Sequence, residues 1–131
     1  MAYSFEVKGE VPAPCEDVYL AWLSSELHSA MTGGEAFVDP VVGGQFTAWG
    51  DYIVGTTLEL QPFHRIVQSW RTTQFNDDDP DSQIEVTFDP SDTGTSVTIR
   101  HSNVPDDHLG YENGGWQKSY LDPMKDYFSS K

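Results

Sequence analysis

GGWQKSYLDPMKDYF, residues 114–128, decides the fold of this chain. After the Gly-Gly hinge, large apolar side chains recur every four residues and stack on one side of a helix, with Leu121 widening the stripe: Trp116, Tyr120, Met124 and Phe128. A stripe of this size needs an apolar partner. We therefore predict a C-terminal helix over residues 116–128 that packs against a sheet and bends at Pro123, because proline removes one backbone hydrogen bond.

Strand patterns ahead of this helix provide the partner. From residue 36 onward, apolar and polar residues alternate with the period of two that is typical of half-buried strands. Turn residues divide this region into segments too close together for parallel crossovers, so neighbouring strands are predicted to be antiparallel. The predicted inward-facing residues are Tyr52, Val54, Thr56, Leu58 and Leu60; Ile66, Gln68, Trp70 and Thr72; Ile84, Val86 and Phe88; and Val97, Ile99 and His101.

The N-terminal region predicts one more strand and two helices. Residues 3–11 alternate as a strand does, with Tyr3, Phe5 and Val7 inward. Pro14 is suited to the first turn of a helix. The buried stripe of that helix is predicted to be Cys15, Val18, Tyr19, Trp22 and Leu23. A second short helix over residues 26–31 ends at Gly33-Gly34. The whole chain, residues 1–131, is predicted to be a single α+β domain.

Composition restricts the partners of this domain. Its 21 Asp plus Glu against 7 Lys plus Arg give a formal net charge of -14, so nucleic acids and anionic membranes are not expected to bind. The acidic surface is either a docking face for a basic partner or an adaptation for solubility. A lone cysteine, Cys15, an N-terminus without a leader pattern and the absence of a long apolar segment favour a soluble protein of the cytoplasm.

Common catalytic and metal-binding motifs are missing. The four histidines share no ligand spacing, and no zinc-protease, nucleophile-elbow or phosphate-loop pattern occurs. Asp77, Asp79 and Asp81 resemble the start of a calcium loop, but Ser82 replaces the required glycine and Phe88 the bidentate glutamate. We predict a solvated turn there, and no metal, cofactor or catalytic residue is assigned.

The inward phase of the strands does predict a binding site. A concave apolar site with a few polar groups is typical of small-molecule pockets. The candidate ligand-binding residues are Phe46, Tyr52, Gln68, Trp70, His101 and Trp116. The alternative is that these side chains only fill the core. His101 is either a core histidine bonded to a backbone carbonyl or a pocket group that donates a bond or moves a proton.

Solvent-facing positions of the same strands carry charge. Arg71, Arg100, Glu59 and Glu85 fall on the outward phase and predict cross-strand ion pairs at the surface.

The ordered motifs resemble a known family over nearly the whole chain. They are VPAP (11–14), VYLAW (18–22), DPVVGGQF (39–46), GTTLEL (55–60), GTSVTIRH (94–101) and GW (115–116). Together they are similar to the family related to the C-terminal domain of the activator of heat-shock protein 90 ATPase, in the START-like or SRPBCC superfamily. The resemblance implies a helix-grip fold, in which six or seven antiparallel strands wrap around a long C-terminal helix with two short helices after the first strand. The resemblance does not identify any residue of this chain as catalytic.

Three functional hypotheses follow. The first is a non-enzymatic protein that holds a small apolar or aromatic molecule between sheet and helix. The second is a chaperone-associated interaction protein that uses its outer surface, with a second copy of the chain as another protein partner. The third is a cyclase or hydrolase that uses His101. An internal cavity favours the first and third, whereas a filled core with an exposed apolar patch favours the second.

Overall fold

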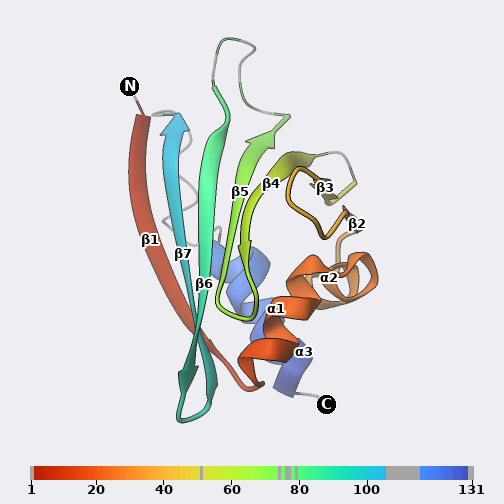
Figure 1. Cartoon of the computed structure of the whole chain (residues 1–131), viewed down its shortest axis with the longest axis vertical. Coiled ribbons are helices and arrows are strands. Elements are labelled where there is room, and N and C mark those ends of the chain that lie inside the picture. Colours follow the sequence, from red (N-terminus) through yellow and green to blue (C-terminus); the bar gives the residue numbers. More distant parts are fainter. Residues whose placement is uncertain are drawn as a thin grey trace.

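A seven-stranded antiparallel sheet curves around the helices in the computed structural model (Figure 1). The structure describes residues 2–50, 52–73, 75, 78, 80–105 and 116–129. The strands are β1 Ala2–Val11, β2 Ala36–Val38, β3 Gln45–Ala48, β4 Ile53–Gln61, β5 Arg65–Thr72, β6 Ser82–Ser91 and β7 Gly94–Pro105. They lie in the order β1-β7-β6-β5-β4-β3-β2, so the chain crosses from β1 to β2 at the opposite edge and returns strand by strand until β7 pairs with β1. The predicted α+β helix-grip fold is confirmed.

Two short helices follow β1, as predicted. Helix α1 spans Cys15–Leu23 and α2 spans Ser25–Thr32. The hydroxyl of Ser24 caps α2 by accepting a hydrogen bond from the Leu27 backbone N–H at 3.2 Å, and Gly33 ends it in the left-handed conformation, φ 83°. Helix α1 buries the predicted stripe except Cys15, which is partly exposed.

The C-terminal helix begins with a π-helical segment. Residues Gln117–Leu121 form this segment, η2, and α3 continues over Asp122–Ser129. The wide turn ends two residues before Pro123, whose ring and missing N–H disfavour a regular α-helical turn immediately before it. It also lets Tyr120 and the adjacent Leu121 both face the core, together with Trp116 and Met124. The Gly114-Gly115 hinge lies outside the described residues.

The predicted inward residues of β5, β6 and β7 form the centre of the core. Ile66, Gln68, Trp70 and Thr72 of β5 are buried, as are the matching positions of the next two strands: Ile84, Val86, Phe88, Val97, Ile99 and His101. Figure 1 shows α1, α2 and α3 grouped on one side of the sheet, where these side chains meet them. The alternation therefore predicts this half of the sheet correctly.

Strand β4 does not follow the predicted phase. The pattern predicts Tyr52, Val54 and Leu58 as inward-facing, but all three are exposed, and Tyr52, 40% exposed, lies in the turn before the strand. Its buried residues are instead Ile53 and Thr57. Thr56, also predicted to face inward, is partly exposed. The prediction for this part of β4 is wrong by one residue.

A bulge explains the error. The pairing of β4 with β5 shifts register between Thr57 and Glu59, and an extra residue at such a point reverses the alternation of side chains. Leu60, after the bulge, does pack against the core, whereas Val54 and Leu58 do not. Apolar residues occupy both phases of this segment, so the alternation could not locate the bulge.

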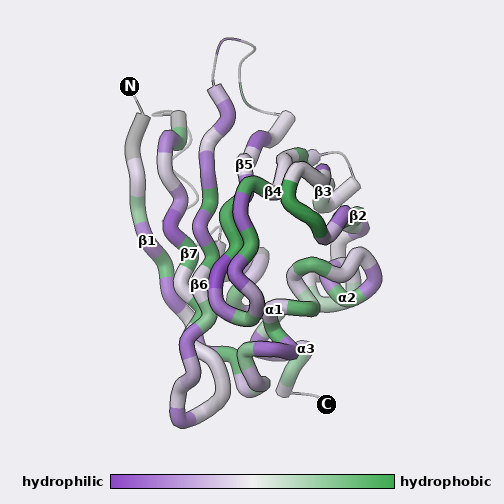
Figure 2. The backbone as a smooth tube through the Cα atoms, in the orientation of Figure 1, coloured by the Kyte–Doolittle hydropathy of each residue, from purple (hydrophilic) through white to green (hydrophobic). Residues whose placement is uncertain are grey.

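Hydropathy follows the arrangement of the sheet. Figure 2 shows purple and green alternating along β1, β6 and β7, as expected for strands with one covered face and one open face. Among the described residues, no helix combines the length and apolar character that crossing a bilayer requires.

Candidate functional site

Four of the six predicted ligand-binding residues meet where the sheet contacts the C-terminal helix. The ring of Trp70 on β5 lies 4.7 Å from Trp116, 5.9 Å from His101 and 6.1 Å from Phe46, measured between centroids. All four side chains are buried. Gln68 is buried one inward position before Trp70, while Tyr52 lies away from this cluster at the surface. The sequence therefore identified the centre of the interior correctly except for Tyr52, which lies in the turn before β4.

His101 connects the helix to two strands. The indole N–H of Trp116 donates to His101 Nδ1 at 3.1 Å. Nδ1 must therefore be an acceptor, so the ring proton is on Nε2, which donates to Ser82 Oγ at 2.8 Å. Ser82 Oγ in turn donates to the Trp70 carbonyl at 2.7 Å. The core interpretation of His101 predicted a bond to a backbone carbonyl. In the structure, Ser82 bridges the His101 ring to the Trp70 carbonyl.

The environment keeps His101 neutral. Burial lowers the pKa of its imidazole from 6.5 to about 3. At neutral pH the ring carries one proton, and both nitrogens are engaged by Trp116 and Ser82. Moving a proton through His101 would require breaking one of these bonds. The geometry therefore favours the core interpretation of His101 over an acid or base.

A second buried histidine was not identified from the sequence. His28 Nδ1 donates to the Trp22 carbonyl at 2.8 Å, and its Nε2 accepts from the Tyr120 hydroxyl at 3.1 Å. Burial lowers the pKa of His28. This arrangement links α2 with the C-terminal helix. The sequence contains one indication that His28 is buried. It lies three residues before Met31, so both fall on the same side of α2, and both are buried.

Both polar atoms of the Gln68 side chain form hydrogen bonds to other side chains. Its Oε1 accepts from the Trp22 indole N–H at 3.1 Å, and its Nε2 donates to Thr57 Oγ1 at 3.2 Å. The Trp22 ring also stacks on Tyr120 with centroids 5.0 Å apart. Gln68 therefore joins α1 to β4 and β5.

Trp70, like Ser96, carries a buried polar atom that no other described residue satisfies. The side chain is 2% exposed, yet its Nε1–H has no hydrogen-bond partner in the described part of the chain. An unmade bond from a buried donor costs about 1–3 kcal/mol. Such a group calls for an acceptor such as a water molecule or a ligand atom. Trp70 therefore provides the one polar group of the predicted set that points to a further binding partner.

The outer surface of the sheet carries a group of exposed apolar residues. We call it the β2–β4 face and define it by residues of β2, β4 and the turn after β2: Phe37, Val41, Val42, Val54 and Leu58. Phe37, 57% exposed, is opposite Thr47 on β3, and Thr47 is opposite Val54 on β4. Residues paired in this way lie on the same side of a sheet. Phe37 and Val54 therefore form one outward row at the edge of the sheet.

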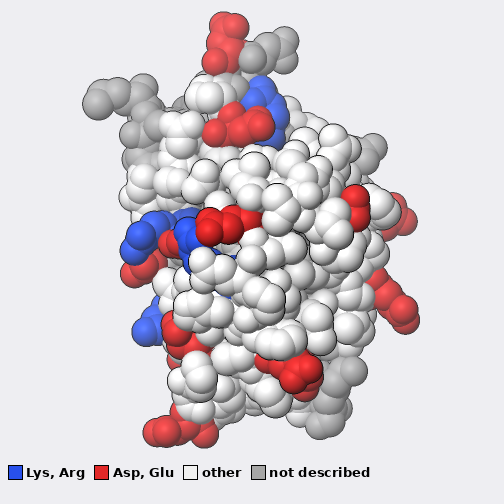
Figure 3. All heavy atoms as spheres, viewed as in Figure 1, with Lys and Arg blue, Asp and Glu red and all other residues white. Residues whose placement is uncertain are grey.

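The turn after β2 brings its two valines to the same region. The backbone N–H of Gly43 donates to the Thr57 carbonyl at 2.8 Å, next to Leu58. Figure 3 shows a broad uncharged area over β3 and β4, bordered mostly by acidic side chains and on one side also by basic ones. An apolar patch with a charged rim is typical of protein interaction sites.

A group of ion pairs lies elsewhere on the outward face of the sheet. Arg65 pairs with Glu59 at 2.6 Å and with Glu85 at 2.5 Å, and Arg100 lies 3.8 Å from Glu85 and 3.4 Å from Glu6. Cross-strand ion pairs were predicted among the outward-facing charges, and Arg100 with Glu85 is one of them; Arg65 was not predicted. These are surface interactions of small individual strength.

The segment that resembles a calcium loop is only partly described. Asp77 and Asp79 lie outside the described residues. Asp81 pairs with Arg71 at 3.2 Å, and its backbone carbonyl accepts from Asn103 at 3.0 Å. Arg71 is thus paired as its outward phase predicts.

Comparisons with known proteins connect this architecture to a family. The profile of a family described as "Activator of Hsp90 ATPase homolog 1-like protein" matches residues 12–129. A Dictyostelium discoideum protein named "Activator of 90 kDa heat shock protein ATPase homolog" is 28% identical over 127 residues, covering 96% of this chain and 33% of that protein. An uncharacterised Schizosaccharomyces pombe protein is 27% identical, covering 88% and 34%. The chain spans about a third of the length of these curated relatives.

Solved structures share the fold. An HSP90 activator from Plasmodium falciparum has a TM-score of 0.84 and 26% identity, covering 97% of this chain and 96% of that chain. A protein from Mesorhizobium loti has a TM-score of 0.81 at 18% identity, covering 98% of each chain. The second likeness shows the fold alone.

Proposed function

The chain belongs to the family of activator of Hsp90 ATPase homolog 1-like proteins, and we propose that it is a non-enzymatic binding protein that docks on a chaperone of the 90 kDa heat-shock class. The Plasmodium falciparum protein with the same fold is titled an HSP90 activator and is matched over 96% of its chain. This likeness supports the role for a single domain of this size.

One observation carries the proposal: the β2–β4 face is apolar, exposed and continuous with the edge of the sheet. Burying Phe37, Val54 and Leu58 against a partner removes apolar area from water at about 25 cal/mol per Å². Exposed aromatic residues at the centre of such a patch commonly contribute most of the binding energy. The surrounding carboxylates suit a partner surface with a basic rim.

Calorimetry with the 90 kDa chaperone from the same organism tests this function. We expect the unaltered protein to bind the chaperone and to change its rate of ATP hydrolysis. Phe37→Ser removes the most exposed aromatic ring of the face, so it should weaken binding about tenfold or more. The variant should fold normally because Phe37 is exposed.

Leu20→Ser is the matched control. Leu20 is 46% exposed on α1, so the substitution removes a similar apolar surface from a different part of the molecule. Binding should be unchanged in this variant. Absence of binding by the unaltered protein, or equal loss in the two variants, would exclude the β2–β4 face as the docking site.

We also propose a second function, binding of an apolar ligand in the interior, because Trp70 Nε1–H lacks a partner among the described residues. A ligand acceptor such as a carbonyl would complete this bond, with Trp116 and Phe46 as apolar contacts. Native mass spectrometry of protein purified from its own host should show a small-molecule adduct that Trp70→Phe reduces. An adduct-free spectrum, with tryptophan emission unaffected by apolar carbonyl compounds, would contradict this function.

A further inference from the structure

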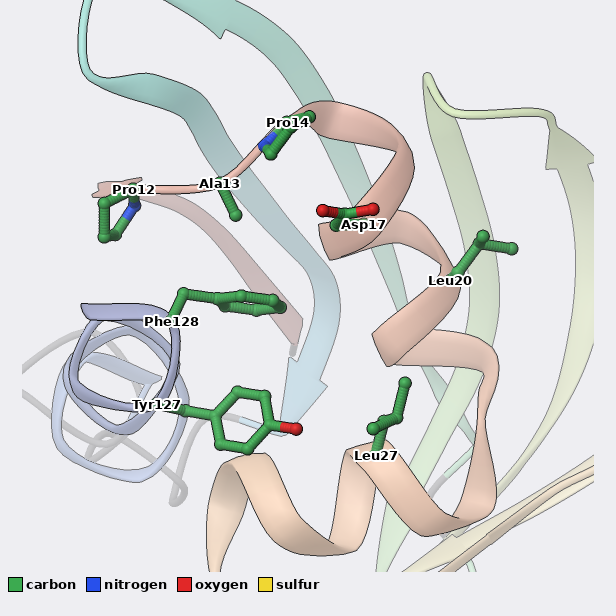
Figure 4. A pocket seen from close by; sticks show the side chains of 8 residues that line it. All are labelled: Pro12, Ala13, Pro14, Asp17, Leu20, Leu27, Tyr127 and Phe128. Carbon is green, nitrogen blue, oxygen red and sulfur yellow. The ribbon is translucent and has the colours of Figure 1, made fainter. Parts of the chain in front are cut away.

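A groove between the three helices is separate from both sites described above. It has a volume of about 370 Å³ and opens to solvent (Figure 4). Its walls are residues 12–14 between β1 and α1, Asp17 and Leu20 of α1, Leu27 of α2, and Tyr127 and Phe128 of α3. Pockets of this size accommodate small organic molecules.

One wall of the groove is aromatic. Figure 4 shows the rings of Tyr127 and Phe128 projecting from α3 toward α1 and α2. Their centroids are 5.1 Å apart and the rings are close to perpendicular, at 82°. Such rings offer apolar contact area, and their negative faces attract cations.

The opposite wall is held in place by the sheet. Thr95 Oγ1, on β7, donates to the Ala13 carbonyl at 2.7 Å. Gly94 lies so close to this connection that a Cβ there would be 2.4 Å from the Val11 carbonyl. Residues 12–14 are therefore fixed against β7. A wall with a fixed backbone lowers the entropy lost when a ligand binds.

Asp17 gives the groove its charge. It lies in the first turn of α1, where the helix dipole favours a carboxylate. Figure 4 shows Asp17 on the α1 side of the groove, across from the Phe128 ring. No lysine or arginine lines the groove, and no ion pair joins Asp17 to another described residue. An apolar groove with one carboxylate is complementary to a molecule that is apolar and positively charged.

We propose that this groove binds a small organic amine, with the ammonium group beside Asp17 and its aromatic or alkyl part against Tyr127, Phe128 and Leu20. The carboxylate supplies charge, and the rings supply area and cation–π attraction. The net charge of -14 raises the concentration of cations near the surface but does not select the groove. Selection comes from the combination of Asp17 with the aromatic wall.

NMR titration with 2-phenylethylamine, which is protonated at neutral pH, tests the proposal. Amide shifts should change around residues 12–28 and 124–128 and saturate. The neutral 2-phenylethanol should bind at least about fivefold more weakly, which corresponds to about 1 kcal/mol. Equal binding of the alcohol, or shifts that map elsewhere, would overturn the proposal. Binding of only a lysine-containing peptide and not of the free amine would also overturn it.

Variants separate the groove from the overall charge. Asp17→Asn should weaken amine binding about fivefold, whereas Glu16→Gln removes the same charge from the neighbouring exposed residue, outside the groove, and should change it less than twofold. Phe128→Leu keeps apolar volume but removes the ring, so it should weaken binding as well. Phe37→Ser should leave amine binding unchanged. Equal effects of Asp17→Asn and Glu16→Gln would show attraction by the whole surface and exclude the site.

Discussion

Two buried histidines carry opposite tautomers, and in each case a neighbour that can play only one role fixes the proton. Trp116 can only donate, so His101 is protonated on Nε2; the Trp22 carbonyl can only accept, so His28 is protonated on Nδ1. Each ring bonds a residue of the C-terminal helix, Trp116 in one case and Tyr120 in the other. Protonating either ring would therefore disturb the attachment of this helix.

His101 should make the protein less stable in acid. Its pKa is about 3 in the folded protein and 6.5 ordinarily, so between these values the unfolded chain binds a proton that the folded protein does not. Its contribution to stability is therefore complete above about pH 6.5 and is lost as the pH falls toward 3. His101→Gln should cost about 1–3 kcal/mol at pH 7 through lost hydrogen bonds. This difference from the unaltered protein should shrink as the pH falls to 4.

Urea denaturation at pH 7, 6, 5 and 4 measures the difference between the two proteins. Carboxylate titration affects the unaltered protein and the variant alike. The difference between their free energies of unfolding therefore isolates His101. His64→Gln is the control, since it makes the same substitution at an exposed histidine in the turn between β4 and β5. A constant difference for His101→Gln would mean that folding does not change the pKa of this ring.

Gly55 is required by close packing. A Cβ at this position would lie 2.0 Å from the Ser69 carbonyl oxygen and 2.4 Å from the Phe46 ring. Gly55→Ala should therefore destabilise the protein by about 1–3 kcal/mol, as overpacking does, which thermal denaturation can measure. Gly9→Ala should cost less, because its Cβ would meet the movable Leu121 side chain at 3.3 Å. Equal melting temperatures for the two variants would contradict the argument.

At the scale of elements, the sequence predicts structure well where one phase of a strand is apolar and poorly where both are. Strands β5 to β7 have a clear inward phase, and every residue predicted to face inward there is buried. In β4, Ile53 and Val54 are both apolar, so the alternation is ambiguous and the bulge after Thr57 decides which one is buried. The π-helical segment likewise depends on how Pro123 packs against the core. The spacing of apolar residues in the sequence does not predict that packing.

Residues of the candidate sites could be predicted from the pattern within one element, whereas contacts between elements could not. Phe46, Trp70, His101 and Trp116 could be assigned to the interior because each lies on an inward phase. Hydrogen-bond partners such as Ser82 and Tyr120 come from other elements, and no spacing within one element predicts them. The groove between α1, α2 and α3 also was not predicted, since it exists only where three helices meet.

The contact between α2 and the C-terminal helix should show energetic coupling. Tyr120→Phe leaves His28 Nε2 without its donor at 3.1 Å and should cost about 1–3 kcal/mol. His28→Gln removes the other partner, and the double variant should be less destabilised than the sum, with a coupling of about 0.5–3 kcal/mol. Free energies of unfolding from urea titration provide the cycle. Tyr120→Phe combined with His64→Gln should be additive, and additivity in both pairs would contradict the link.

On the scale of the whole molecule, acidic residues outnumber basic ones three to one. The chain has 21 acidic and 7 basic residues, and three arginines are already held in pairs with carboxylates. The remaining carboxylates repel one another across a small domain. The described ion pairs are at the surface, where each contributes at most about 1 kcal/mol.

Moderate salt should therefore stabilise the protein. Charges are screened beyond about 10 Å at 0.1 M salt, which weakens repulsion among dispersed carboxylates more than it weakens pairs in contact. The midpoint of urea denaturation at pH 7.5 should rise between 10 and 200 mM sodium chloride. Choline chloride at the same ionic strength should give the same rise, because screening does not depend on the identity of the cation. A flat or falling midpoint would show that the net charge of -14 is balanced locally, and a rise with sodium alone would point to specific ion binding instead of screening.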